Sequence, residues 1–174
     1  MDALIFENLV TTNKNQFVAK VRSIASKLFI DPNWLMAVMY KESGLNHKAV
    51  NSHGGATGLI QFMPATATGL GTTTQSLLAM SNVDQLDYVY KYFQPYKMKI
   101  LSYPDLYLIT FFPAALSKPI DYIFQTTRLP AAVVARFNPT IDINKDGTIT
   151  MSEFITYSYN GFTTAVQTIL KKKA

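Results

Sequence analysis

Apolar residues recur at helical spacing near the start of the chain. Between residues 15 and 29 polar and basic residues separate a set of apolar ones: Phe17, Val18, Val21, Ile24, Leu28 and Phe29. A repeat of three and four residues places such side chains on one face of an α-helix. The pattern therefore predicts an amphipathic helix over residues 15–29.

The next segment is apolar on nearly every side. The run NWLMAVMYKES follows Asp31 and Pro32, which are typical of the N-cap and the first position of a helix. Gly44 follows the run and readily adopts the left-handed conformation that ends many helices. We expect a helix between Pro32 and Gly44 that the rest of the domain surrounds, with Trp34 in the core.

The remainder of the chain is divided by turn and helix signals. Residues 45–63 carry asparagine, histidine and paired glycines, which predict a loop or short β-hairpin. Three further helices have start signals and are expected near Pro64, from Ser81 to Pro95, and from Pro104 to near Pro113. Residues 116–137 contain helical pieces that prolines interrupt.

Length and composition fit one domain. The chain has 174 residues, 48% of them hydrophobic, which is enough to bury a full core. The sequence therefore predicts a predominantly α fold in a single domain, residues 1–174, with a small loop or β-hairpin region after the second helix.

Charge and cysteine content restrict the partners. A net charge of +5 suggests an acidic partner, for which nucleic acid, anionic membrane and bacterial cell wall all qualify. Nucleic acid is not predicted, because no stretch gathers five or six lysines and arginines. The absence of cysteine excludes disulfides and thiolate metal sites.

Targeting signals are not seen in the sequence. The start, MDALIFENLV, lacks the basic region of a signal peptide, and no apolar segment approaches the length of a membrane span. Action at the cell wall, in the periplasm or outside the cell, would then require another export route, such as a holin or a phage virion.

A calcium loop is predicted near the end of the chain, in DINKDGTITMSE, residues 142–153. Oxygen ligands stand at the positions that an EF-hand uses, and Gly147 stands at the sharp turn. The expected ligands are Asp142, Asn144, Asp146, the carbonyl of Thr148, Thr150 through its hydroxyl or a water, and two oxygens of Glu153. The alternative is an Asp-Gly turn followed by a capping box of Thr150 and Glu153. A single loop favours structural Ca²⁺ over a calcium switch.

Glu42 has an unusual setting among the three glutamates of the chain. Glu153 is assigned to calcium, and Glu7 lies in a peripheral first segment. Glu42 lies in the last turn of an apolar helix, where desolvation and the helix dipole both raise the expected pKa of a carboxylic acid. A protonated carboxylic acid is what glycoside cleavage requires of its proton donor.

A family resemblance is carried by residues 31–70. The segments Glu42-Ser43-Gly44, Asn46, Ala49-Val50-Asn51 and Gly58-Leu59-Ile60-Gln61-Phe62-Met63-Pro64-Ala65-Thr66-Ala67 resemble the catalytic core of soluble lytic transglycosylases, which are related to goose-type lysozyme. The resemblance implies a lysozyme-like fold that cleaves the β-1,4 bond between N-acetylmuramic acid and N-acetylglucosamine in peptidoglycan. Glu42 would be the single acid and base, and the product would carry a 1,6-anhydro ring.

The same resemblance implies a set of substrate-binding residues. Gln61 would hydrogen-bond the sugar, Gly58 would let it approach the backbone, and Asn51 or Ser52 would stand near the developing charge, with Ser43 beside Glu42. The family also carries a Tyr-Asn pair on a later helix. Residues 105–116 correspond to it but have phenylalanines there, so Phe111 is expected to line the cleft and Tyr107 to replace the hydroxyl.

Alternatives to transglycosylation remain open. A hydrolytic lysozyme would need a second carboxylate, and no acid occurs from Ser43 to Asn82, although Asp84, Asp87, Asp105 or Asp121 could reach the site by folding. A phage virion or tail protein could keep this fold as a glycan-binding module. His47 and His53 form a three-ligand metal set with Glu42 on paper, but they lack the helical His-Glu-x-x-His arrangement and are interpreted as loop histidines.

Overall fold

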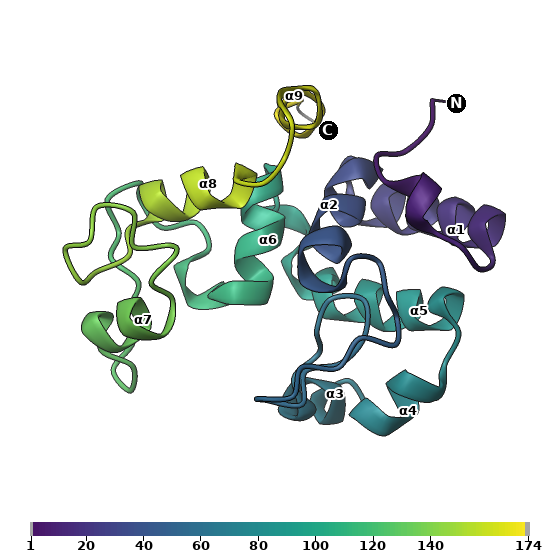
Figure 1. Cartoon of the computed structure of the whole chain (residues 1–174), viewed down its shortest axis with the longest axis horizontal. Helices are drawn as coiled ribbons and strands as arrows, with labels where there is room; N and C mark the ends of the chain where they lie inside the picture. The colour runs from purple at the N-terminus through teal and green to yellow at the C-terminus, as the bar shows by residue number, and fades with distance from the viewer. Residues whose placement is uncertain (1, 173–174) are drawn as a thin grey trace. The chain divides into compact units, whose positions relative to one another are not determined.

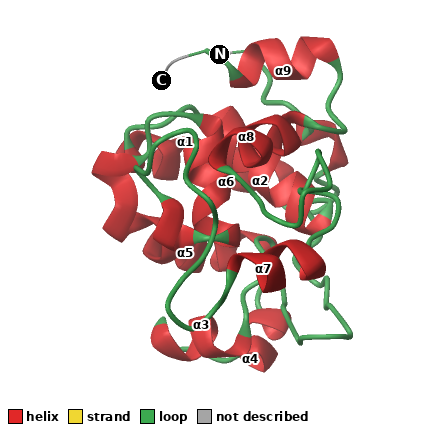
Figure 2. Cartoon of the chain, turned by 90° about the vertical axis from the view of Figure 1, so that its left-hand side faces the viewer, coloured by secondary structure: helices red, strands yellow, loops and turns green. Residues whose placement is uncertain are grey.

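The protein is mostly helical, as the sequence predicts. The computed structural model describes residues 2–172 and shows helices joined by loops, with isolated β-bridges but no strand among these residues (Figures 1 and 2). Its contacts divide the chain into two compact units. Unit 1 ends at Ile100, and unit 2 runs from Leu101 to Lys172. The single domain of residues 1–174 stays a prediction.

Unit 1 is built on three packed helices and smaller pieces. Its elements are η1 (Glu7–Leu9), α1 (Lys14–Leu28), α2 (Pro32–Ser43), α3 (Pro64–Gly69), α4 (Thr74–Ala79), α5 (Asn82–Phe93) and η2 (Gln94–Lys99). Helix α1 packs against both α2 and α5. It buries the predicted face, with Phe17, Val21 and Leu28 almost fully covered. The amphipathic helix over residues 15–29 is therefore confirmed to within one residue.

Helix α2 is the central helix of unit 1 and has the predicted ends. The side chain of Asp31 accepts a hydrogen bond of 2.7 Å from the backbone N–H of Asn33, as an N-cap does. Every residue from Trp34 to Met39 is buried, which explains the apolar composition on all sides. Gly44 ends the helix in the left-handed region with φ of 62°.

The segment between α2 and α3 is a series of turns. Two antiparallel bridges, Val50 with Thr57 and Thr57 with Phe62, are its β-structure, so it is the short hairpin-like region that the sequence predicts. Helix α3 begins at Pro64, also as predicted. Helix α4 was not predicted; it is six residues long and is capped by Thr73.

Unit 2 contains shorter helices around an aromatic cluster. Its elements are α6 (Tyr103–Phe111), η3 (Pro113–Ala115), α7 (Ala131–Phe137), α8 (Met151–Tyr159) and α9 (Thr164–Leu170). Helix α6 packs against α8. The core between them is aromatic, and its rings belong to Tyr103, Tyr107, Phe111, Phe112, Phe124 and Phe154.

Of the helices formed by residues 2–172, none has both the length and the apolar composition that crossing a lipid bilayer requires.

We expect Asp31→Ala to lower the free energy of unfolding by about 1 kcal/mol, because it removes the N-cap of α2. The measurement is guanidinium denaturation followed by fluorescence of Trp34, the single tryptophan, which is buried in α2. Asp2→Ala is the matched control, because Asp2 is exposed and caps no helix. Equal stability of the two variants would contradict the assigned cap.

Candidate active site

Glu42 lies in the last turn of α2 and is neither fully buried nor fully exposed. Its neighbours show that the surroundings are partly dry. Burial lowers the pKa of Lys41 to about 8, although the charge of Glu42 opposes this shift. Burial raises the pKa of Tyr92 to about 12, assisted by Tyr96 and by the charge of Glu42. The phenol of Tyr92, on α5, therefore keeps its proton at neutral pH and lies within electrostatic reach of Glu42.

Ser43 connects the end of α2 to the loop that follows it. Its hydroxyl lies 3.1 Å from the carbonyl oxygen of Met39 and 2.9 Å from that of Leu59, and it donates toward both. The hydroxyl is thus directed at the protein backbone. Ser43 positions the loop beside Glu42, and its predicted contact with substrate stays a prediction.

Gln85 holds the same loop from the other side. Its side chain is completely buried on α5. Its Oε1 accepts a hydrogen bond of 3.0 Å from the backbone N–H of Leu59, and its Nε2 donates to the carbonyl oxygens of His47 (2.6 Å) and Leu77 (2.7 Å). One carboxamide therefore connects α5, the end of α4 and two points of the loop.

Gly58 makes room for that carboxamide. A Cβ atom at this position would lie 2.4 Å from Oε1 of Gln85, a distance at which one of the two must move. The backbone also has a φ of +82°, which disfavours other residues. The fold therefore has its own need for glycine here, and the predicted approach of a sugar to Gly58 stays a prediction.

The remaining predicted loop residues are fixed by local hydrogen bonds. Gln61 is in the left-handed region, and its Nε2 donates to the carbonyl oxygens of Gly58 (3.1 Å) and Ala49 (3.4 Å). Asn51 and Ser52 are exposed. Oδ1 of Asn51 accepts from the N–H of His53 (2.9 Å). These side chains belong to the one loop that follows Glu42, as predicted, and their substrate contacts stay predictions.

The two histidines behave as loop residues. His53 is exposed, and partial burial together with Lys48 lowers the pKa of His47. Among residues 2–172 no three side chains of histidine, cysteine, aspartate or glutamate gather so that they could hold a metal ion. Glu42, His47 and His53 are therefore not gathered as a three-ligand metal site.

Tyr107 and Phe111 lie in the aromatic cluster of unit 2. The ring of Tyr107 is 8% exposed and is stacked with Tyr103, at 6.2 Å between ring centroids. Phe111 is stacked on Phe154 at 5.4 Å. Both therefore contribute to the core between α6 and α8, and their predicted roles toward substrate stay predictions.

The sequence places Tyr92 only within a group of candidate cleft-wall tyrosines, with Tyr88, Tyr90 and Tyr96. Sequence reasoning did not single out Gln85, although one signal was present. In the helix after Ser81, Gln85 falls on the face that Leu86 and Val89 bury. A polar residue on a buried face requires hydrogen-bond partners, but the sequence does not show which ones. The burial that distinguishes Tyr92 from Tyr88 and Tyr90 arises from the tertiary fold, so the sequence does not show it.

The loop of residues 142–153 has the turns of a calcium loop. Oδ2 of Asp142 accepts from the N–H of Gly147 (3.1 Å), Oδ1 of Asn144 from that of Asp146 (3.0 Å), and Oδ1 of Asp146 from that of Thr148 (2.8 Å). Gly147 has a φ of +83°, as the sharp turn requires. Oδ1 of Asp142 is buried and has no hydrogen-bond partner. Such an orphaned carboxylate oxygen fits a cation ligand.

Glu153 instead forms the capping box of α8. Its Oε1 accepts from the N–H groups of Ile143 and Asn144, and its Oε2 accepts from the N–H and hydroxyl of Thr150. Burial opposes ionisation, but these hydrogen bonds hold the pKa of Glu153 below its usual range. The capping box is therefore formed. The loop offers oxygen ligands, but among residues 2–172 Asp142, Asp146 and Glu153 are not gathered as a metal-binding group, and Ca²⁺ binding stays a prediction.

The loop of residues 142–153 packs against the preceding segment of unit 2. Ile123 and Thr150 form an antiparallel bridge, and the N–H of Phe124 donates to the carbonyl of Ile149 (2.8 Å). Ile149 and Phe124 are completely buried. The loop is therefore fixed to the aromatic core of unit 2.

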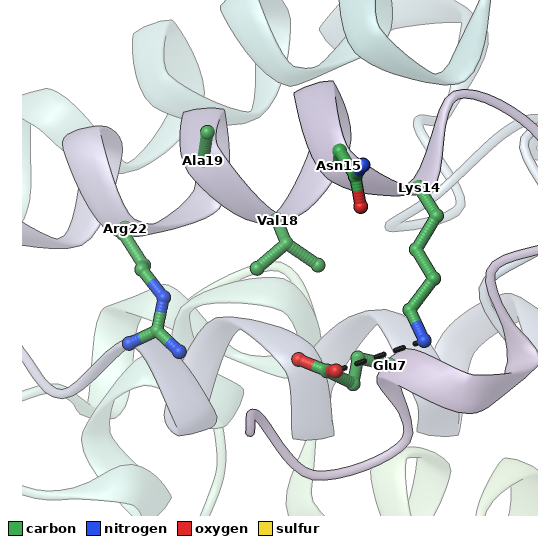
Figure 3. A pocket seen from close by; sticks show the side chains of 6 residues that line it. All are labelled: Glu7, Lys14, Asn15, Val18, Ala19 and Arg22. Atoms are coloured by element: carbon green, nitrogen blue, oxygen red, sulfur yellow. Dashed lines mark ion pairs between the residues drawn. The ribbon is translucent and has the colours of Figure 1, made fainter. Parts of the chain in front are cut away.

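Cavities of unit 1 lie beside α1 and at the end of α2. One of about 410 Å³ is lined by Glu7, Lys14, Asn15, Val18, Ala19 and Arg22, with Glu7 and Lys14 3.6 Å apart (Figure 3). Another, of about 200 Å³, is lined by residues that include Gly44, His47 and Asn82. Neither lining includes Glu42.

Comparison with known proteins identifies a similar family. Residues 20–96 match the family described as "Transglycosylase SLT domain". The matched part extends from α1 through η2 and contains Glu42, its loop and Gln85. No solved structure matches the chain. The match supports a peptidoglycan-cleaving function of the lytic transglycosylase kind in general, with the cell wall as its place of action.

We expect Gln85→Met to lower the free energy of unfolding by about 3 kcal/mol, because it leaves one buried N–H and two carbonyl groups without their partner.

Gly58→Ala should also lower the free energy of unfolding, because its Cβ would contact Oε1 of Gln85 and because the backbone has a positive φ. In Gln85→Ser the contact disappears, so the Gly58→Ala substitution should cost less in that background. Denaturation followed by Trp34 fluorescence measures all four variants of this cycle.

The matched control is Gln16→Met, at an exposed glutamine of α1, which should leave stability unchanged. Strict additivity of Gly58→Ala and Gln85→Ser would contradict the assigned contact between the two residues.

Proposed function

We propose that the chain is a lytic transglycosylase that cleaves the β-1,4 bond between N-acetylmuramic acid and N-acetylglucosamine. The observation that carries the proposal is Glu42, a half-buried carboxyl at the end of α2, inside the part of the chain that matches the transglycosylase family. The burial that lowers the pKa of Lys41 and raises that of Tyr92 supports a partly desolvated end of α2, which is the kind of setting that a general acid requires.

Glu42 would serve as acid and then as base. It donates its proton to the glycosidic oxygen as the bond from C1 of the muramic acid residue breaks, and the released sugar leaves with a hydroxyl group. The carboxylate then removes the proton of the C6 hydroxyl, whose oxygen forms the new bond to C1. Glu42 is protonated again at the end, and no water is consumed.

The loop would hold the substrate next to this acid. Asn51 and Ser52 are exposed and can reach a ligand, and Gln61 has a carboxamide oxygen to offer while its Nε2 is bound to the backbone. Tyr92 adds a neutral phenol within electrostatic reach of Glu42. That phenol can supply the hydroxyl for which the sequence suggested Tyr107, since Tyr107 packs in the core of unit 2.

A second candidate is a glycan-binding module of a phage virion or tail. Its support is the position of Tyr107 and Phe111 in an aromatic core, which leaves the family's Tyr-Asn pair without an equivalent on α6. Against it stands Glu42, because a module that only binds gains nothing from a partly desolvated acid. A third candidate is a hydrolytic lysozyme that uses a second carboxylate. Its product would carry a reducing end in place of the 1,6-anhydro ring.

We propose, in addition, that residues 142–153 bind a structural Ca²⁺. Asp142, Asn144 and Asp146 would supply side-chain oxygens, Thr148 its carbonyl, and Thr150 and Glu153 the remaining positions. The support is the buried, unpartnered Oδ1 of Asp142 together with the turns at Asn144 and Asp146. To bind the ion, Glu153 would give up the hydrogen bonds that it accepts from the backbone. The bound Ca²⁺ would neutralise the negative charge of the carboxylates in the loop.

Glu42→Gln should reduce the clearing of a purified peptidoglycan suspension at least about a hundredfold, because it removes the general acid. Turbidity measures the rate, and Trp34 fluorescence verifies that the variant is folded. The control is Glu7→Gln, which changes the other glutamate of unit 1, ion-paired with Lys14, and should leave the rate unchanged. Equal rates for wild type and Glu42→Gln, or no clearing by wild type, would overturn the enzymatic proposal.

Calcium titrated into metal-free protein should give a saturable heat of binding in calorimetry, and Asp142→Ala should abolish it. At a free Ca²⁺ concentration one hundred times Kd, the gain in unfolding free energy should be about 2.7 kcal/mol. Asp121→Ala is the control, since Asp121 is an exposed carboxylate of unit 2 outside the loop. Binding that survives Asp142→Ala, or no binding by wild type, would contradict the site.

A further inference from the structure

One surface of unit 1 combines lysines with exposed aromatic and apolar side chains. We call it the lysine–aromatic face, and it comprises Lys20, Lys27 and Phe29 from α1 and the residue after it, Tyr88, Tyr90 and Lys91 from α5, and Lys97, Met98 and Lys99 from η2. The helices α1 and α5 that carry it pack side by side, and η2 packs against both.

A series of contacts connects α1, α5 and η2 across this face. Nζ of Lys20 lies 2.8 Å from the carboxylate of Asp87 on α5. Two turns further along α1 and about one turn further along α5, Lys27 lies over the ring of Tyr90, at 5.6 Å from its centroid. Lys97 lies over the ring of Phe29, also at 5.6 Å, and so connects η2 to the end of α1.

The face is strongly positive. Asp87 pairs with Lys20, whereas Lys27, Lys91, Lys97 and Lys99 have no carboxylate within salt-bridge distance among residues 2–172. Lys91 lies over the ring of Tyr88 at 4.7 Å, so its charge is held near an aromatic surface as well. Four uncompensated cations on one face attract a polyanionic partner.

Two large apolar side chains in these segments are exposed. Phe29 is 66% exposed and Met98 is 74% exposed. Phe29 also has a φ of 60°, in the left-handed region where glycine or asparagine is the usual residue after a helix. The fold therefore gains little burial and no backbone stability from a phenylalanine at this position.

We propose that the lysine–aromatic face docks on the surface of an anionic phospholipid bilayer. Apolar side chains that enter the boundary between headgroups and acyl chains, surrounded by lysines that contact phosphate, are the arrangement that interfacial binding requires. A soluble polyanion would engage the lysines but would leave Phe29 and Met98 in water. The proposal rests on unit 1 alone and does not depend on the activity proposed for Glu42.

The test is cosedimentation of the full chain with vesicles. Vesicles of phosphatidylcholine that contain phosphatidylglycerol should bind the protein, and vesicles of phosphatidylcholine alone should bind it much more weakly. Lys27→Gln with Lys97→Gln should weaken partitioning roughly thirtyfold, since each lysine near an anionic surface contributes about fivefold. The matched control is Lys118→Gln with Lys171→Gln, which removes the same charge from unit 2 and should have little effect.

A second pair of variants tests the apolar part. Phe29→Asn places a residue suited to the left-handed region and should not impair folding; combined with Met98→Gln it should weaken vesicle binding and make what remains fully sensitive to salt. Equal weakening by the two lysine pairs would overturn the proposal, as would absence of binding to anionic vesicles. Vesicle binding unchanged by Phe29→Asn with Met98→Gln, and abolished by soluble polyphosphate, would assign the face to a polyanion.

Discussion

The candidate active site depends on two hydrogen bonds made by the backbone of Leu59. Its carbonyl oxygen accepts from Ser43, at the end of the helix that carries Glu42, and its N–H donates to the buried carboxamide of Gln85 on α5. The turns of the loop are closed by its own backbone hydrogen bonds, such as those that Thr57 and Phe62 exchange at 3.0 and 2.9 Å, but these bonds do not connect it to α2 or α5. Gly58 permits this arrangement because a larger residue would collide with Gln85. The position of the loop relative to Glu42 is thus set by side chains from two helices.

Unit 2 fixes an irregular loop by a different means. Residues 142–153 are held by carboxylates that accept backbone N–H groups, and by the packing of Ile149 against Phe124. Glu153 stabilises α8 as part of its capping box. A structural cation would add to a loop that already has a defined course, which agrees with a stabilising role and not with a switch.

The parts of the fold that neighbouring residues in the chain determine could be predicted from the sequence. Asp31, Pro32 and Gly44 define both ends of α2 through capping and backbone conformation, and these signals depend on neighbours in the chain. Helix α4 was missed because six residues are too few to show a hydrophobic period. The partners of Gln85 could not be predicted, because His47, Leu59 and Leu77 reach it only through the tertiary fold.

The chemical nature of the product tests the account most directly. Peptidoglycan digested by the wild-type protein is separated into muropeptides, and their masses are compared with those from a hydrolytic muramidase. If Glu42 acts alone as acid and base, the new muramic acid ends carry the 1,6-anhydro ring and each is one water lighter than the hydrolytic product. Reducing ends in their place would contradict the account, since they require an activated water and a second group to activate it.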